Sequence, residues 1–118
     1  MSPAYGNSRA VAAAVAAIDA GREPEPAVLR DATRTLLAEL ARRAPGRSVE
    51  VRVPPYGAIQ CVGGPRHARG TPPNVVEADP VTWVRVAAGR MPWADAVGSG
   101  LLRASGARAD LSPYLPLA

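Results

Sequence analysis

Residues 79–106 have the sequence DPVTWVRVAAGRMPWADAVGSGLLRASG and carry the strongest structural signals in the chain. Asp79 followed by Pro80 is a strong helix start, because the carboxylate can cap free backbone N–H groups and proline fits the first helical turn. Gly89 ends that helix, and Pro92 begins a second, shorter one. The pattern predicts two consecutive short helices.

Strand signals lie on both sides of these helices. Over residues 49–54, three valines alternate with charged residues, a pattern typical of a half-buried strand. A Pro-Pro-Tyr-Gly turn leads to a second strand over residues 58–62, so the two form an antiparallel hairpin. Residues 74–78 and residues 101–105 are expected to form the third and fourth strands.

Two further helices are predicted near the N-terminus, after a leader over residues 1–7. Residues 8–20 place valine and isoleucine on one helical face, and Gly21 follows as the stop signal. Residues 26–43 form the clearer helix, because leucines recur at helical spacing along one face. Its charged residues, Glu39 among them, are expected to face solvent.

These elements predict an α+β domain in which helices cover a small, mostly antiparallel sheet of about four or five strands. A chain of 118 residues is too short for two separately stable cores. We therefore expect one domain over residues 1–118, with a pair of N-terminal helices over residues 8–44. The sheet and the short helices are expected within residues 48–117.

The amino-acid composition indicates what kind of side chains form the core and which kinds of binding partner are expected. Hydrophobic residues make up 47% of the chain but there is no Phe, so the core must consist mostly of small side chains. All 14 basic residues are arginines, and the net charge is +4. The arginines are spread along the chain and lack interleaved aromatic residues, which argues against a nucleic-acid partner.

Membrane, disulfide and metal chemistry are not expected. The longest apolar stretch is too short and alanine-rich to span a bilayer, and the first residues lack the pattern of a secretory signal. We therefore expect a cytoplasmic protein without stable membrane insertion. The single cysteine, Cys61, excludes an intramolecular disulfide and is expected to be a buried, inert thiol. With only one histidine, no metal site is expected.

The order of elements resembles a known family. The step from Gly89 to Pro92 (Gly-basic-x-Pro) and the strand between Gly100 and Gly106 (Gly-x-Leu-x-x-x-Gly) resemble the sterol-carrier-protein superfamily, and most closely its small stand-alone bacterial orthologues. The resemblance covers Val75 to Leu117 and extends to residues 48–62. It implies an apolar-ligand-binding fold, and hence a non-catalytic protein that binds a lipid-like or fatty-acyl small molecule without a cofactor.

The hypothesis of an apolar-ligand-binding protein predicts an apolar pocket beneath the short helices. Its walls would come from the few large apolar side chains of the core, namely Leu36, Ile59, Trp83, Met91, Trp93 and Leu101. Ordinary core packing explains the same residues, because large aromatic side chains dominate any small core. If the core closes completely, the fold would act as a structural or protein-interaction module. A homodimer or partner surface could then form on the tail, at Tyr114, Leu115 and Leu117.

The segment between the second and third strands concentrates unusual chemistry. Two arginines, the histidine and a hydroxyl lie among glycines and prolines and could bind the anionic head group of a ligand; these residues are Arg66, His67, Arg69 and Thr71. The alternative is a solvated connector without a ligand, because the spacing matches no specific phosphate-binding motif.

An enzymatic role is the third possibility. Bacterial mycothiol-dependent isomerases carry a C-terminal domain of similar fold, which would make the chain an accessory domain or subunit of an enzyme. Their metal site lies in a separate N-terminal helical domain, and a chain with one histidine cannot supply it. No serine is placed by the sequence beside His67 and an acidic partner, so catalysis by this chain alone is not expected.

Overall fold

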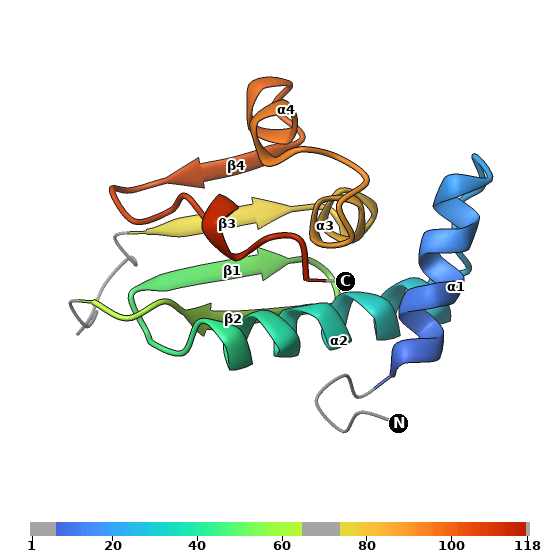
Figure 1. The fold of residues 1–118 in the computed structure, drawn as a ribbon, viewed down its shortest axis with the longest axis horizontal. Helices are drawn as coiled ribbons and strands as arrows, with labels where there is room; N and C mark the ends of the chain where they lie inside the picture. The colour runs from blue at the N-terminus through green and yellow to red at the C-terminus, as the bar shows by residue number, and fades with distance from the viewer. Residues whose placement is uncertain (1–6, 65–73, 118) are drawn as a thin grey trace.

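The structure is a computed structural model that describes residues 7–64 and 74–117, and it has the α+β fold that the sequence predicts (Figure 1). Every helix and strand expected in these ranges is present, with small shifts at the ends. In chain order the elements are α1 (Ser8–Asp19), α2 (Pro26–Arg43), β1 (Val49–Val53), β2 (Gly57–Cys61), β3 (Val75–Ala78), α3 (Pro80–Ala87), α4 (Trp93–Gly98), β4 (Leu102–Ser105) and a 3-10 turn (Ser112–Tyr114).

The four strands form one sheet in the order β2-β1-β3-β4 (Figure 1). The pairs β1–β2 and β3–β4 are antiparallel, whereas β1 and β3 run parallel at the centre. The predicted hairpin between β1 and β2 is confirmed, and its turn is closed by the Tyr56 N–H, which donates to the Val53 carbonyl at 2.9 Å. The sheet is therefore mixed, with antiparallel pairs on both sides of one parallel pair.

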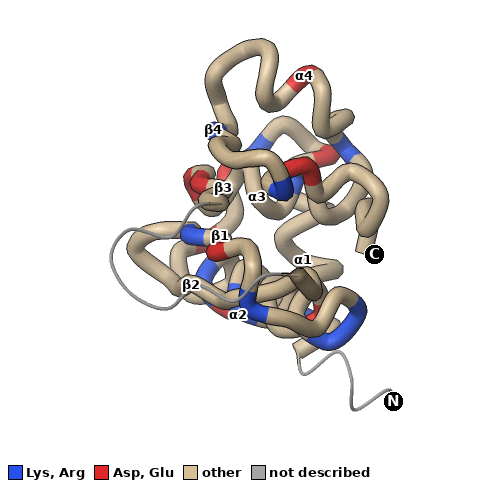
Figure 2. Tube along the Cα trace, turned by 90° about the vertical axis from the view of Figure 1, so that its left-hand side faces the viewer, with Lys and Arg blue, Asp and Glu red and all other residues tan. Residues whose placement is uncertain are grey.

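The two faces of the sheet differ in polarity. Val49, Val51 and Val53 of β1 are buried, and the alternate positions Glu50 and Arg52 lie on the other face. There an Arg52 nitrogen lies 2.7 Å from a Glu50 oxygen, and acidic and basic positions are neighbours along β1 (Figure 2). Charged side chains on the Glu50 and Arg52 face can remain in contact with water. The helices therefore pack on the valine face.

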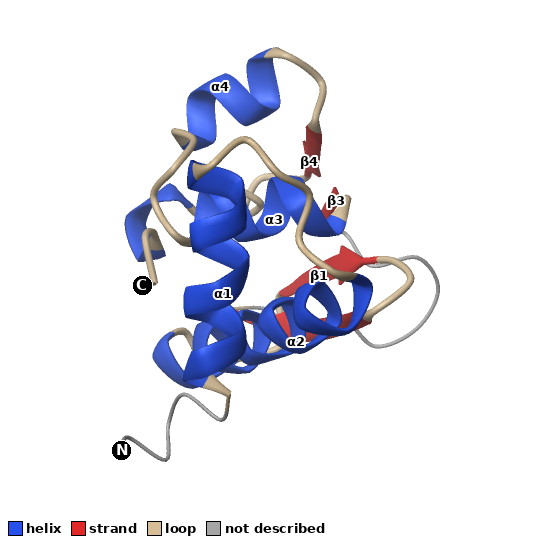
Figure 3. Ribbon diagram, turned by 90° about the vertical axis from the view of Figure 1, so that its right-hand side faces the viewer, coloured by secondary structure: helices blue, strands red, loops and turns tan. Residues whose placement is uncertain are grey.

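The helices form a layer on one side of the strands (Figure 3). Helices α2 and α3 pack against each other and α2 packs against β2, whereas α1 packs across α2 and α3 rather than against the sheet. Helix α4 lies beside β4 (Figure 1). The candidate site lies between α1 and the end of α3, at the edge of the main core.

Trp83 of α3 is the largest fully buried side chain. Its indole Nε1 donates to the Thr33 carbonyl of α2 at 3.3 Å, which joins the two helices by a buried hydrogen bond. Leu36, Leu37 and Leu40 of α2 are also buried around this interface. Large side chains thus fill the space between the sheet and the α2–α3 pair.

The expectation that Glu39 faces solvent is wrong, since only 1% of this residue is exposed. Its carboxylate accepts hydrogen bonds from Arg42 at 2.7 Å and from Arg43 at 2.5 Å, and these bonds hold the pKa of Glu39 below its ordinary value although burial opposes the shift. Arg43 also donates to the Leu117 carbonyl at 2.9 Å, and Leu117 is buried, so the expectation that Leu117 belongs to an exposed tail surface is wrong. The C-terminal segment therefore covers part of α2, which the helical periodicity of α2 alone does not reveal.

Candidate functional site

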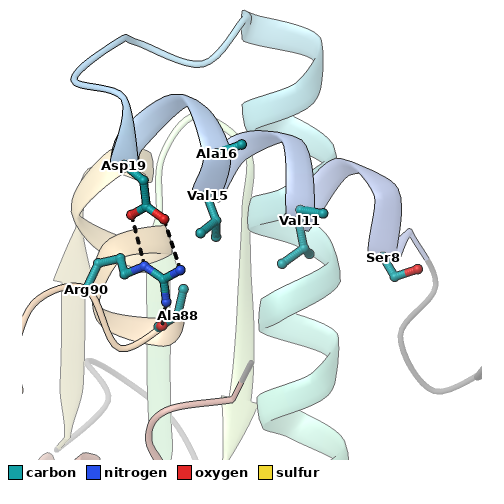
Figure 4. A pocket seen from close by; sticks show the side chains of 8 residues that line it. Ser8, Val11, Val15, Ala16, Asp19, Ala88 and Arg90 are labelled. Atoms are coloured by element: carbon teal, nitrogen blue, oxygen red, sulfur yellow. Dashed lines mark hydrogen bonds and ion pairs between the residues drawn. The ribbon is translucent and has the colours of Figure 1, made fainter.

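An open groove of about 440 Å³ lies between α1 and the C-terminal end of α3 (Figure 4). It is lined by Ser8, Val11, Ala12, Val15, Ala16, Asp19, Ala88 and Arg90. Figure 4 shows Val11 and Val15 pointing from α1 into the space above Ala88 and Arg90. Below, this space is called the α1–α3 groove.

The apolar wall of the groove follows from the sequence of α1. Val11 and Val15 are four residues apart and so lie on one helical face, and the alanines beside them are too small to fill the gap to α3. The Asn7 side chain caps the helix by accepting from the Ala10 N–H at 3.0 Å. A regular helix of small side chains therefore stands over α3 and leaves space beneath it.

One end of the groove is charged. The Arg90 guanidinium donates to both Asp19 carboxylate oxygens, at 2.9 Å from Nε and 3.0 Å from Nη2 (Figure 4). The side chains are 43% and 48% exposed, so water reaches both partners. The hydrogen bonding between Arg90 and Asp19 lowers the pKa of the Asp19 carboxyl group. The same interaction raises the pKa of the Arg90 guanidinium. Both groups are therefore charged at neutral pH.

The backbone at the end of α3 sets the position of Arg90. Gly89 has a φ of 75°, a left-handed conformation that glycine adopts without strain. The Arg90 N–H then donates to the Arg85 carbonyl at 2.7 Å, which is the Schellman arrangement of a helix end. This turn directs the chain so that Ala88 and Arg90 line the groove, whereas Gly89 and Met91 line a different space.

That second space is a cleft of about 290 Å³ between the α3–α4 linker and the C-terminal segment. It is lined by Val86, Gly89, Met91, Pro92, Trp93, Ser112, Leu115 and Pro116. The Leu117 N–H donates to the Ala87 carbonyl at 2.7 Å and holds the C-terminal segment beside α3. The linker from Ala88 to Met91 thus separates two apolar spaces.

The six apolar residues expected to share one pocket lie in different places. Met91 and Trp93 are brought together in the cleft. Leu36 and Trp83 are fully buried in the core. Ile59 is half-buried on the side of β2 that faces the helices, as its pairing with Val51 requires. Leu101 is 46% exposed and lines a more polar hollow with Asp79 and Arg103.

The expected anion-binding residues Arg66, His67, Arg69 and Thr71 lie outside the described residues. Cys61 is fully buried, and its burial raises the pKa of the thiol to about 11, so it is protonated at neutral pH as expected for an inert thiol. Within residues 7–64 and 74–117, no three His, Cys, Asp or Glu side chains cluster as metal ligands would. In the same ranges, no helix has the length and apolar character to span a membrane.

The groove residues themselves were not expected to form a site. The sequence placed Val11 and Val15 on one face of a helix, and this pattern alone indicates core packing. Arg90 was identified only as the basic residue of the Gly-basic-x-Pro step. The available signal was the lack of any large apolar side chain over residues 8–17 of that helix, because a wall of alanine and valine cannot fill the space against a neighbouring helix.

Comparison with protein families agrees with this architecture. Residues 25–117, well over half of the chain, match the family model described as bacterial SCP ortholog. Helix α1 precedes the matched residues, and so one wall of the groove lies outside the part of the chain that the family model covers. No curated protein matches the chain.

Proposed function

Because the chain belongs to the family of bacterial SCP orthologs, the sterol-carrier-like proteins that the sequence resembles, we propose that it is a cytoplasmic, non-catalytic binding protein for an apolar small molecule of the lipid or fatty-acyl type. The observation that supports this proposal is the α1–α3 groove, whose volume of about 440 Å³ is that of a small-ligand site. The ligand lies along Val11 and Val15, with α3 as the floor.

The binding energy comes from the apolar chain of the ligand. Each buried methylene contributes about 0.8 kcal/mol, from which the loss of translational and rotational freedom on association must be subtracted. An open groove buries only part of the ligand surface, so a chain of about twelve carbons is a suitable probe, with affinity in the micromolar range. Such a site exchanges its ligand readily, as a carrier must.

Titration calorimetry with 1-dodecanol tests the proposal, after native mass spectrometry has established whether an apolar molecule copurifies. In the variant Ala12→Trp, an indole replaces an exposed methyl group that lines the groove. The matched control is Ala38→Trp, an exposed position of α2 that is not part of the groove. We expect saturable binding by the wild type and by Ala38→Trp, and at least roughly tenfold weaker binding by Ala12→Trp.

The proposal fails if dodecanol does not bind up to its solubility limit and no apolar molecule copurifies. Equal dodecanol affinity of Ala12→Trp and Ala38→Trp would show that the ligand binds outside the α1–α3 groove. The first alternative location is then the cleft of Met91 and Trp93, the two predicted pocket residues that lie side by side. A Trp93→Ala variant would lose binding in that case.

A second candidate function, a protein-interaction module, rests on a different observation. Val97 of α4 and Leu101 just before β4 are large apolar residues that are 38% and 46% exposed, and the chain turns between them with the Gly100 N–H donating to the Val97 carbonyl at 3.1 Å. Neighbouring exposed apolar residues are a feature of partner surfaces. A homodimer that forms through Val97 and Leu101 would have twice the monomer mass in light scattering. The variant Leu101→Ser would then have the mass of the monomer.

A further inference from the structure

Within the described residues, the sheet ends in two edge strands, β2 and β4, and the two differ in how they are protected (Figure 1). Strand β4 carries Arg103, whose side chain is 77% exposed, and α4 lies beside this strand. Strand β2 has the sequence Gly-Ala-Ile-Gln-Cys and holds neither a charged residue nor a proline. Charges and prolines are usual means by which an edge strand avoids pairing with another chain. By these criteria β2 is the open edge.

The direction of the backbone groups at the β2 edge follows from the hydrogen-bond ladder. The Glu50 N–H donates at 3.0 Å to the carbonyl of the residue before β3, so the backbone groups of Glu50 point toward β3. Those of the next residue, Val51, point the opposite way and face its partner Ile59 in β2. The N–H and C=O groups of Ala58 and Gln60 therefore point outward, where β2 has no partner strand among the described residues.

The side chains at this edge are neutral and only partly covered. Helix α2 packs on the valine face of β2, since a methyl group at Gly57 would lie 3.4 Å from Leu37 Cδ1. On the other face, Ala58 and Gln60 are exposed. Ile59 packs against the core from the valine face but is only half-buried. The edge thus combines outward-facing backbone donors and acceptors with an apolar side chain that water still reaches.

We infer that β2 pairs antiparallel with β2 of a second copy of this chain, on a two-fold axis at Ile59. In this register Ala58 of each copy lies opposite Gln60 of the other, and each such pair exchanges both of its backbone hydrogen bonds. The two Ile59 residues then form a non-hydrogen-bonded pair, with Cα atoms about 4.5 Å apart and side chains in contact. A second copy fits because the strand is complementary to itself: a small side chain meets a long one in both directions, and no like charges meet.

This interface is independent of the proposed ligand binding in the α1–α3 groove. It is also separate from the exposed residues Val97 and Leu101, which lie near β4 at the opposite edge of the sheet. A single strand pair is a small interface, and small interfaces belong to transient complexes. We therefore expect a reversible dimer with a dissociation constant in the micromolar range.

Sedimentation equilibrium over a series of protein concentrations tests the inference. The apparent mass of the wild type should rise from the monomer mass of 12.2 kDa toward twice that value. Ile59→Lys places like charges opposite each other on the axis and should weaken the dimer at least roughly tenfold. Far-UV circular dichroism checks that this variant is folded, which we expect because the lysine stem can pack as isoleucine does while the ammonium group reaches water at the edge.

A charge-complementary pair of variants separates lost pairing from lost folding. Ile59→Glu alone should also be monomeric, but an equimolar mixture of Ile59→Lys and Ile59→Glu should form a dimer again, because opposite charges then meet on the axis. The matched control is Ala104→Lys, which places the same charge at an exposed position of the β4 edge. It should dimerise as the wild type does.

A wild type that stays monomeric throughout the series overturns the inference, and so does a mixture of the two Ile59 variants that forms no dimer. A wild-type dimer that Leu101→Ser abolishes and Ile59→Lys leaves intact would place the interface at Val97 and Leu101, and would also overturn it. Each of these results leaves the proposed ligand binding untouched, because that proposal is tested with dodecanol on the other side of the helix layer.

Discussion

Helix α3 has neighbours on two sides, and the two interfaces differ. Toward α2, Trp83 and the leucines of α2 are fully buried and close-packed. Toward α1, the apolar side chains that line the space are alanine and valine, and a groove of about 440 Å³ remains. Both interfaces join regular helices, so the size of the side chains explains why one is closed and the other open.

The comparison also shows why the large core residues do not surround an open space. Trp83 and Leu36, two of the large residues expected to surround a pocket, fill the space between α2, α3 and the sheet. A core with few large side chains must use them for packing, since voids in an interior cost stability. Open space then remains where the apolar side chains are small, as between α1 and α3.

The largest effect is expected from emptying the closed interface. Trp83→Ala removes a fully buried indole and its hydrogen bond to the Thr33 carbonyl, so the free energy of unfolding should fall by about 3–5 kcal/mol. Trp93→Ala is the control, because Trp93 is only half-buried beside the cleft and its loss should cost clearly less. Urea unfolding followed by far-UV circular dichroism measures both. Equal losses would contradict the contrast between core and surface cleft.

A smaller difference in the free energy of unfolding is expected when a valine is replaced by alanine at each of the two interfaces. Val84→Ala, in the closed core, should lower the free energy of unfolding by about 2 kcal/mol, whereas Val15→Ala, beside the open groove, should lower it by less than about 1 kcal/mol. Both changes place alanine in a helix, so helix propensity largely cancels. Equal destabilisation in urea titrations would mean that the groove is closed in solution.

The smallest expected effect concerns two ion pairs at acid pH. The pKa of Glu39 is lowered from its ordinary value of 4.5, so its contribution to stability is complete above that pH and disappears as the pH falls through the lowered pKa. In thermal melts below pH 4.5, Glu39→Gln should therefore lose less stability than the wild type. Asp19→Asn should follow the wild-type curve closely, because its ion pair with Arg90 is exposed. A reversed order of the two variants would contradict the burial of Glu39.

Local signals were sufficient to predict the helices and strands. The Asp79 side chain accepts from the Thr82 N–H at 3.2 Å, so the predicted cap of α3 is present. Period-two valines predicted β1, and the glycines expected to end α1 and α3 do follow these helices, in a left-handed conformation. What these signals could not give was the parallel pairing of β1 with β3 or the hydrogen bond from Arg43 to the Leu117 carbonyl, because both join segments far apart in the chain.

The site was harder to predict than the fold. Large apolar residues were expected to mark the pocket, but Leu36 and Trp83 pack in the core and Leu101 lies at the surface, so residue size did not locate an open space. The groove depends on which helix stands over α3, a tertiary relation between residues such as Asp19 and Arg90, which are 71 positions apart. Only the pairing of Asp19 with Arg90 in space reveals its charged end.

The central claim is that an apolar ligand lies in the groove between α1 and α3. Intermolecular nuclear Overhauser effects between 1-dodecanol and the methyl groups of the protein test it most directly. The account predicts contacts from the alkyl chain to Val11, Val15 and Ala88, which line the groove. Contacts confined to Met91 and Leu115, which line the cleft across the linker, or no contacts at saturating dodecanol, would contradict it.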